Sequence, residues 1–127
     1  MKILETVLYA ENLAECRDFY ADVLGLEVIS FDPDRDLFLK LDGSVLILFK
    51  PSKTVIHDAG VPPHGTVGIG HLAFQCGIDE IDAVRDGLKA KGVPIIQEIT
   101  WRNGARSFYF TDPAGNVLEF ATPNLWL

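Results

Sequence analysis

The sequence predicts an α+β fold built from two βαβββ modules, and two observations lead to this prediction. A pattern of one strand, one helix and three strands occurs twice along the 127 residues. The helix ends and the final hairpin turn of both copies also carry matching residues. The modules are expected at 1–50 and 70–127, joined by a linker loop at 51–69. Because most strand residues are apolar, we expect the two curled mixed sheets to form a half-open barrel around a cavity.

The first module opens with a predicted strand at 3–10 and an amphipathic helix at 13–24. Asn12 stands where an N-cap residue is favoured, and Glu15 follows at the spacing of a capping box. Gly25 comes directly after the last apolar position, as helix-ending glycines do. Three further strands, ending at the stretch LILFK, complete this module.

The second module repeats these signals in the same order. A strand is predicted at 71–76 and a helix at 80–91. Asp79 is the expected N-cap, Asp82 lies at the same offset as Glu15 in the first module, and Gly92 ends the helix. The three strands that follow end at the stretch VLEFA.

The closing hairpins align the two modules residue by residue. Their turns are predicted at Asp42-Gly43 and at Asp112-Pro113-Ala114-Gly115. Each final strand has a residue four positions after the turn glycine: Ile47 in the first module and Glu119 in the second. The sequence therefore predicts that these two residues occupy equivalent positions.

Composition narrows the class of protein. A net charge of −7 and a pI near 4.8 argue against binding to nucleic acid, which needs a basic surface. The longest apolar runs are too short to span a bilayer, and the first residues lack a signal-peptide pattern, so we expect a soluble cytoplasmic protein. Cys16 and Cys76 lie in apolar patterns and are expected to be buried, reduced thiols.

Glu119 is unusual because its strand is otherwise apolar on both faces. An enclosed carboxylate is costly unless it is paired with another group or bound to a cation. Glu5 and His71 are the out-of-pattern polar residues of the first strand in each module. Ordinary interpretations also exist: a hydrogen-bonded core histidine, a solvated glutamate at a strand edge, and a pairing of Glu119 with Arg102 or Arg106.

Three stretches resemble the vicinal oxygen chelate superfamily of glyoxalases, bleomycin-resistance proteins, extradiol dioxygenases and fosfomycin-resistance transferases. They are NLAECRDFYADVLGL, GHLAF and RSFYFTDPAGNVLEF, at 12–26, 70–74 and 106–120. The resemblance implies metal ligands at Glu5, His71 and Glu119. Ile47, at the fourth family position, cannot ligate. One imidazole and two carboxylates suit a divalent Mn, Fe, Co, Ni or Zn ion.

Other residues are expected around the cavity. Alternation along the strand places Tyr109 beside Glu119, where its hydroxyl could donate a proton or a hydrogen bond; the other interpretation is a core tyrosine. Trp101 and Arg106 are candidate substrate contacts, although we prefer a surface salt bridge for the arginine. His64 could reach the cavity from the loop, and the role of His57 is open. The apolar wall is expected at Leu37, Leu39, Leu41, Ile47 and Phe49.

Two functions compete. The first is a metal-dependent enzyme of glyoxalase or dioxygenase-like type (a lyase or isomerase, a transferase or a dioxygenase), in which a divalent metal chelates oxygens of a small-molecule substrate. The alternative is a metal-free binding protein, similar to bleomycin-resistance proteins, that sequesters an aromatic or drug-like ligand. Retention of Glu5, His71 and Glu119 favours the enzyme. The resemblance and the apolar tail at 125–127 further predict a homodimer.

Overall fold

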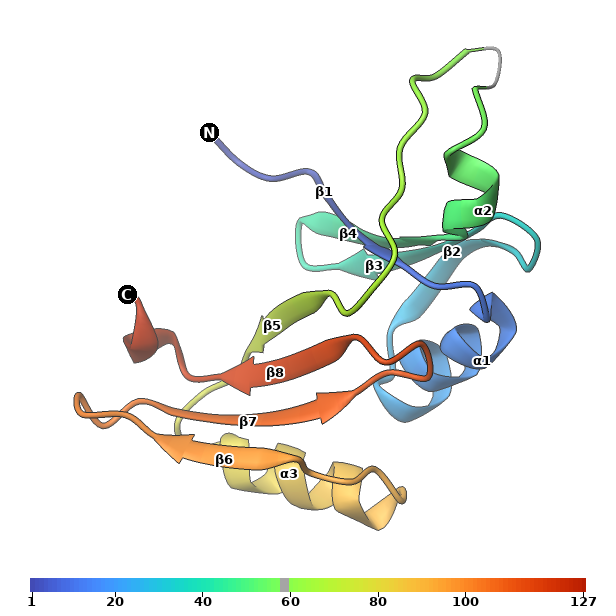
Figure 1. The fold of residues 1–127 in the computed structure, drawn as a ribbon. Coiled ribbons are helices and arrows are strands. Elements are labelled where there is room, and N and C mark those ends of the chain that lie inside the picture. The colour runs from blue at the N-terminus through green and yellow to red at the C-terminus, as the bar shows by residue number, and fades with distance from the viewer. Residues whose placement is uncertain (58–59) are drawn as a thin grey trace. The chain divides into compact units, whose positions relative to one another are not determined.

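A computed structural model of the chain describes residues 1–57 and 60–127 (Figure 1). The chain divides into two compact units, Met1–Gly70 and His71–Leu127. Each unit contains one four-stranded mixed sheet with few helices, which confirms the α+β class. The half-open barrel depends on how the two units are placed, and it stays a prediction.

Unit 1 has a parallel first strand and an antiparallel remainder. Strand β1 pairs in parallel with β4, and β4, β3 and β2 pair antiparallel, in the spatial order β1-β4-β3-β2. The elements are β1 (Glu5–Tyr9), α1 (Leu13–Asp18), η1 (Phe19–Val23), β2 (Glu27–Asp32), β3 (Asp36–Leu41), β4 (Ser44–Phe49) and α2 (Pro51–Thr54).

Unit 2 repeats this topology. Its order is β5-β8-β7-β6, again with the first and last strands paired in parallel. The elements are β5 (His71–Gln75), α3 (Ile81–Ala90), β6 (Gln97–Thr100), β7 (Arg106–Thr111), β8 (Val117–Ala121) and η2 (Pro123–Leu125). The doubled unit predicted from the sequence is therefore confirmed.

The first helix differs from the prediction in its second half. It is α-helical only to Asp18 and continues as a π-helix, η1, from Phe19. Gly25 follows with a φ of 75°, so this glycine ends the helix as predicted. Asn12 is at the N-cap position, but its side chain donates to Glu15 Oε2 at 3.2 Å and makes no capping bond to the backbone.

The predicted cap of the second helix is wrong by one residue. Helix α3 begins at Ile81, so Glu80, and not Asp79, occupies the N-cap position. The Glu80 carboxylate accepts a hydrogen bond from the Gly77 backbone N–H at 3.1 Å, which stabilises this turn. Gly92, with a φ of 82°, lies just after the helix as predicted.

The core of unit 1 lies between its sheet and α1. Leu37 and Leu39 are fully buried, opposite Leu48 and Leu46 in register, and α1 contacts β3 on this face. The expectation that Leu37, Leu39 and Leu41 face the cavity with Ile47 is therefore wrong, because Ile47 is paired with Phe38. Two residues separate the pair Leu41 and Ser44 at the end of this hairpin, whereas three separate the equivalent pair Asp112 and Asn116 in unit 2. The alignment of the two modules therefore shifts by one residue upstream of the turn.

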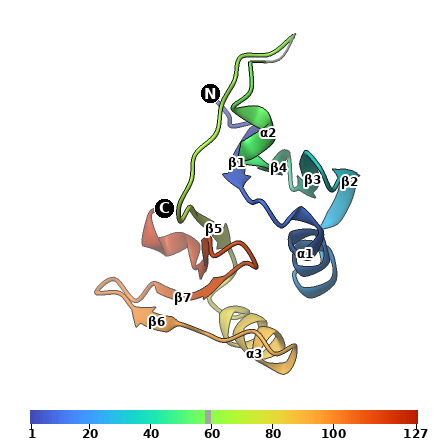
Figure 2. The same ribbon diagram turned by 45° about the vertical axis from the view of Figure 1, so that its right-hand side comes forward.

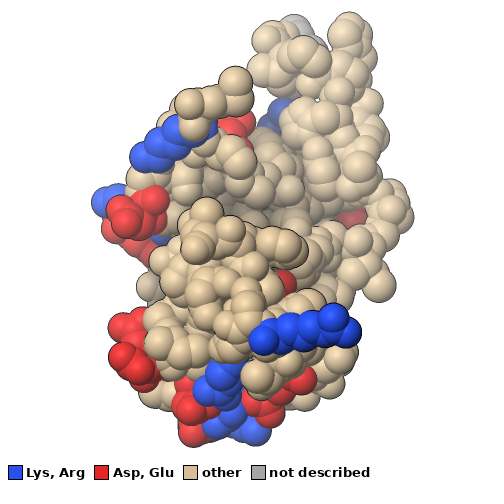
Figure 3. Space-filling view, turned by 90° about the vertical axis from the view of Figure 1, so that its left-hand side faces the viewer, with Lys and Arg blue, Asp and Glu red and all other residues tan. Residues whose placement is uncertain are grey.

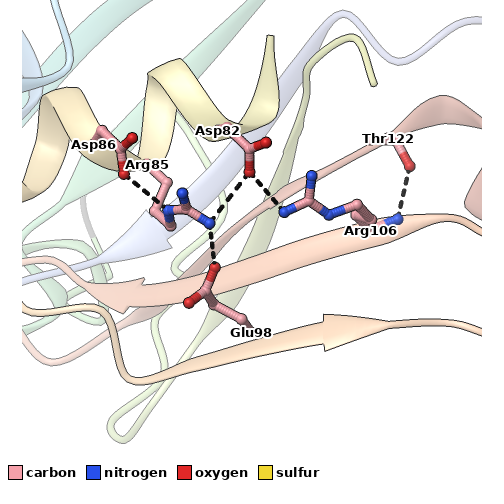
Figure 4. A network of polar contacts seen from close by, with 6 residues as sticks. All are labelled: Asp82, Arg85, Asp86, Glu98, Arg106 and Thr122. Atoms are coloured by element: carbon pink, nitrogen blue, oxygen red, sulfur yellow. Dashed lines mark hydrogen bonds and ion pairs between the residues drawn. The ribbon is translucent and has the colours of Figure 1, made fainter. Parts of the chain in front are cut away.

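Helix α3 covers one face of the sheet in unit 2 (Figure 2). Ile81 and Leu88 are buried on its apolar side. A polar network joins its charged side to the sheet (Figure 4). Arg85 contacts Glu98 of β6 at 2.7 Å and also Asp82 and Asp86, and Arg106 of β7 contacts Asp82 at 2.7 Å.

Both cysteines are buried and neither forms a disulfide, as predicted. Burial raises the pKa of the Cys76 thiol, and the negative charge of Glu80 raises it further. Neither thiol is therefore placed to act as a nucleophile.

In the part of the chain that the structure describes, the absence of long apolar helices and the mixed surface charge both agree with the composition of the sequence. Among the described residues, no helix has the length and apolar character needed to cross a bilayer. On the face drawn in Figure 3, acidic and basic side chains of the described residues lie among one another, and most of the surface is uncharged.

Candidate functional site

Glu119 lies at the centre of the unit 2 sheet, on the face opposite α3. Its register partners are Tyr109 on β7 and Ala73 on β5. Only 5% of the residue is exposed. The expectation that this glutamate is enclosed is therefore confirmed, and its carboxylate lacks full solvation.

His71 begins β5 and lies on the same face. Its Nδ1 is 2.9 Å from the carbonyl oxygen of Val117. Because a carbonyl can only accept, Nδ1 must carry a proton, and in the neutral ring Nε2 then presents a lone pair. Nε2 lies 3.3 Å from Glu119 Oε2. Two acceptors at this separation repel each other unless a proton or a cation lies with them.

The second carboxylate oxygen gives independent evidence of a missing partner. Among the described residues, Glu119 Oε1 is the buried side-chain atom that has no hydrogen-bond partner. A buried acceptor left this way costs about 1–3 kcal/mol or more when it is charged. A divalent cation would satisfy this oxygen and the lone pair of His71 together, so the donor set fits the metal that the resemblance implies.

Tyr109 lies beside both groups. Its ring stacks on that of His71, with centroids 6.2 Å apart. Burial raises the pKa of Tyr109, and a hydrogen bond with Ser107 opposes this increase. A hydrogen bond with the Glu119 carboxylate and its negative charge raise the pKa further. The phenol therefore stays protonated at neutral pH and can donate to an oxygen atom bound at this site.

The structure brings Trp101 to this face but not Arg106. The Trp101 indole N–H donates to Ser107 Oγ at 3.0 Å, and Ser107 lies two residues from Tyr109 on the same face of β7. The guanidinium of Arg106 lies on the opposite face, with Asp82. The salt-bridge interpretation of this arginine is confirmed.

Glu5, the third predicted ligand, is exposed at the start of β1 in unit 1. Its register partner is Val45, as Val117 is the partner of His71, and Ile47 occupies the position of Glu119. The predicted equivalence of the two modules is thus borne out at the level of register. Within either unit, no three His, Cys, Asp or Glu side chains of the described residues cluster closely enough to hold a metal ion. Glu5 as a ligand stays a prediction.

The remaining predicted contacts lie in unit 1. Ile47 is 2% exposed. The edge of His64 packs on Phe49, with centroids 5.0 Å apart, and His64 Nδ1 lies 2.7 Å from the Tyr9 hydroxyl. Sequence reasoning missed Tyr9; its position four residues after Glu5 in the same strand would have placed it on this face. His57 is exposed in the loop.

Comparison with known proteins identifies the family. Residues 2–120 match the Glyoxalase/Bleomycin resistance protein/Dioxygenase superfamily. The chain therefore belongs to this superfamily, as its motifs predicted.

Solved structures of similar proteins cover nearly all of the chain. A lactoylglutathione lyase from Agrobacterium tumefaciens is 38% identical, with a TM-score of 0.95 over 98% of this chain and 96% of that one. An integron cassette protein from the metagenome of the Halifax Harbour sewage outfall is 26% identical, with a TM-score of 0.75 over 95% and 97%. A glyoxalase/bleomycin resistance protein/dioxygenase from Nocardioides, 24% identical with a TM-score of 0.77 over 96% and 83%, shows the same fold.

Proposed function

We propose that this protein is a metal-dependent enzyme of glyoxalase or dioxygenase-like type that acts on a small molecule with two neighbouring oxygen atoms. His71 and Glu119 would hold the cation, with Glu5 as the third protein ligand. The observation that supports this most is the contact of 3.3 Å between His71 Nε2 and Glu119 Oε2, beside a buried carboxylate oxygen that lacks a partner. The 38% identity to a lactoylglutathione lyase supports the same class of chemistry.

The residues of the site have separable roles. The Val117 carbonyl fixes the His71 ring so that Nε2 points at the carboxylate. When bound, a Mn, Fe, Co, Ni or Zn ion would act as a Lewis acid that polarises the adjacent oxygens of the substrate. Tyr109, kept protonated by burial, would donate to one of these oxygens. Trp101, Ile47, Phe49 and His64 stay predicted substrate contacts.

Metal content tests this proposal. The untagged protein should contain close to one divalent ion per chain, measured by elemental mass spectrometry after purification. His71→Ala and Glu119→Gln should remove most of it while circular dichroism shows a retained fold. The controls are His57→Ala, an exposed histidine of the loop, and Glu98→Gln, on the opposite face of the unit 2 sheet; both should keep the metal.

The opposite result would support the alternative function. If the parent protein holds no metal, takes up none when it is offered, and binds aromatic ligands equally well in all four variants, it would be a sequestering protein. The enzyme proposal would then be wrong.

The homodimer and the cytoplasmic location also stay predictions. Light scattering of the purified protein measures the first directly, with twice the 14.0 kDa chain mass as the expected result.

A further inference from the structure

A second feature of unit 2 lies next to the candidate metal centre. It is a pocket of about 270 Å³ between β5, the end of β8 and the C-terminal segment. This segment follows directly after β8 (Figure 1). The pocket is lined by Ala73, Phe74, Gln75, Ala121, Thr122, Pro123, Trp126 and Leu127. None of their side chains is charged, so these side chains suit an apolar ligand group.

Part of the pocket lining belongs to the Glu119 face of the sheet. Ala73 is the register partner of Glu119, and Gln75 is the partner of Ala121 one step further along both strands. Two residues along a strand span roughly 6.6 Å. A ligand whose polar end lies at Glu119 would therefore reach the pocket with a short linker.

The wall formed by the C-terminal segment is held in place by hydrogen bonds. Thr122 is buried; its hydroxyl accepts from the Arg106 backbone N–H at 2.9 Å and donates to Asn124 Oδ1 at 2.7 Å. Asn103 donates to the backbone carbonyl of Asn124 at 2.7 Å. The Trp126 side chain lies beyond these anchors and is 85% exposed, so its ring offers apolar surface to a ligand.

We propose that this pocket binds the apolar part of the substrate and that Trp126 determines which apolar groups are accepted. This proposal rests on the proposed metal-dependent function. Cavities of about 150 Å³ bind benzene, so this volume accommodates a phenyl group or a branched chain of similar size.

Two hydroxamates test the proposal, because a hydroxamate offers two neighbouring oxygens to a metal. Acetohydroxamate carries only a methyl group, whereas 3-phenylpropanohydroxamate carries a phenyl group on a two-carbon linker. Calorimetric titration of the zinc-loaded protein should show roughly tenfold to hundredfold tighter binding of the phenyl compound. In Trp126→Ala the ratio of the two affinities, phenyl compound over acetohydroxamate, should fall below about threefold. The affinity for acetohydroxamate itself should stay unchanged. The control Ile96→Ala removes an exposed apolar side chain outside the pocket and should keep the full ratio.

The outcomes separate the two proposals. If Trp126→Ala keeps the full ratio, the pocket is not the binding site for the apolar group and the inference is wrong. Light scattering on the same samples then shows whether Trp126 instead contacts a second copy of the chain. In that case the parent would have the mass of a dimer and Trp126→Ala the mass of a monomer. If neither hydroxamate binds and the protein takes up no zinc, the proposed function itself has failed.

Discussion

Glu119 and Ile47 occupy equivalent positions in two modules of the same topology, and both are almost fully buried. The isoleucine contributes apolar burial, whereas the glutamate places a carboxylate in the same setting with one oxygen lacking a partner. Such a residue lowers stability unless a ligand compensates for it. At the scale of single residues, Glu119 is therefore better explained by binding than by folding.

This argument predicts that Glu119→Ile stabilises the metal-free protein. The free energy of unfolding in urea should rise by about 1–3 kcal/mol, because an apolar side chain replaces an incompletely paired buried charge. Saturating zinc should stabilise the parent but not the variant. A metal-free variant less stable than the parent would show that the carboxylate has a stabilising partner, contrary to the account.

At the scale of elements, two glycines of different helices have opposite conformational requirements. Gly25 ends the first helix with a φ of 75°, whereas Gly87 lies inside α3 with no positive φ. A Cβ atom at either position would meet nothing within 4 Å. Only the backbone conformation therefore distinguishes the two substitutions.

Gly25→Ala should lower the free energy of unfolding by about 1–2 kcal/mol, because alanine is strained in the left-handed region. Gly87→Ala should raise it by about 0.5–1 kcal/mol, because alanine favours the helix. Urea denaturation of both variants, compared with the parent, measures the difference. Changes of the same sign in both would contradict the assigned helix boundaries.

At the scale of the whole molecule, the two units hold different parts of the predicted metal site. His71 and Glu119 belong to unit 2, and Glu5 belongs to unit 1. A cation that binds only the folded state stabilises it by about 2.7 kcal/mol at one hundred times its dissociation constant. If all three residues are ligands, this stabilisation must appear in both units.

Hydrogen exchange with and without zinc measures how the stabilisation by the cation is divided between the two units. We predict slower exchange of backbone amides in β5 and β8 and also in β1, which carries Glu5. The variant Glu5→Gln should lose the effect in β1 and bind zinc more weakly. Protection confined to β5 and β8 would remove Glu5 from the ligand set and leave His71 and Glu119 in place.

The sequence was sufficient to predict the doubled topology and the equivalence of Glu119 with Ile47 and of His71 with Glu5. These predictions hold because the helix-ending glycines and the turn glycines set the same register in both modules. Phe38 was missed as the counterpart of Tyr109, because turn length decides which residues face each other upstream of a turn.

The sequence could not have predicted which ring nitrogen of His71 carries the proton. This depends on the position of the Val117 carbonyl in the neighbouring strand, a contact that no local pattern encodes. The ion-pair partner of Arg106 could not have been predicted either, because Asp82 lies on a helix 24 residues earlier in the chain. Strand alternation alone, however, would have placed this arginine on the face opposite Tyr109.

Nitrogen-15 NMR of the histidine side chains tests the central claim most directly, since the chain contains only His57, His64 and His71. Under mildly alkaline, metal-free conditions, the account predicts that His71 carries its proton on Nδ1. One equivalent of zinc should then shift the Nε2 resonance of His71 and leave the other two histidines unchanged. A proton found on Nε2 of His71, or no response of that nitrogen to zinc, would contradict the account.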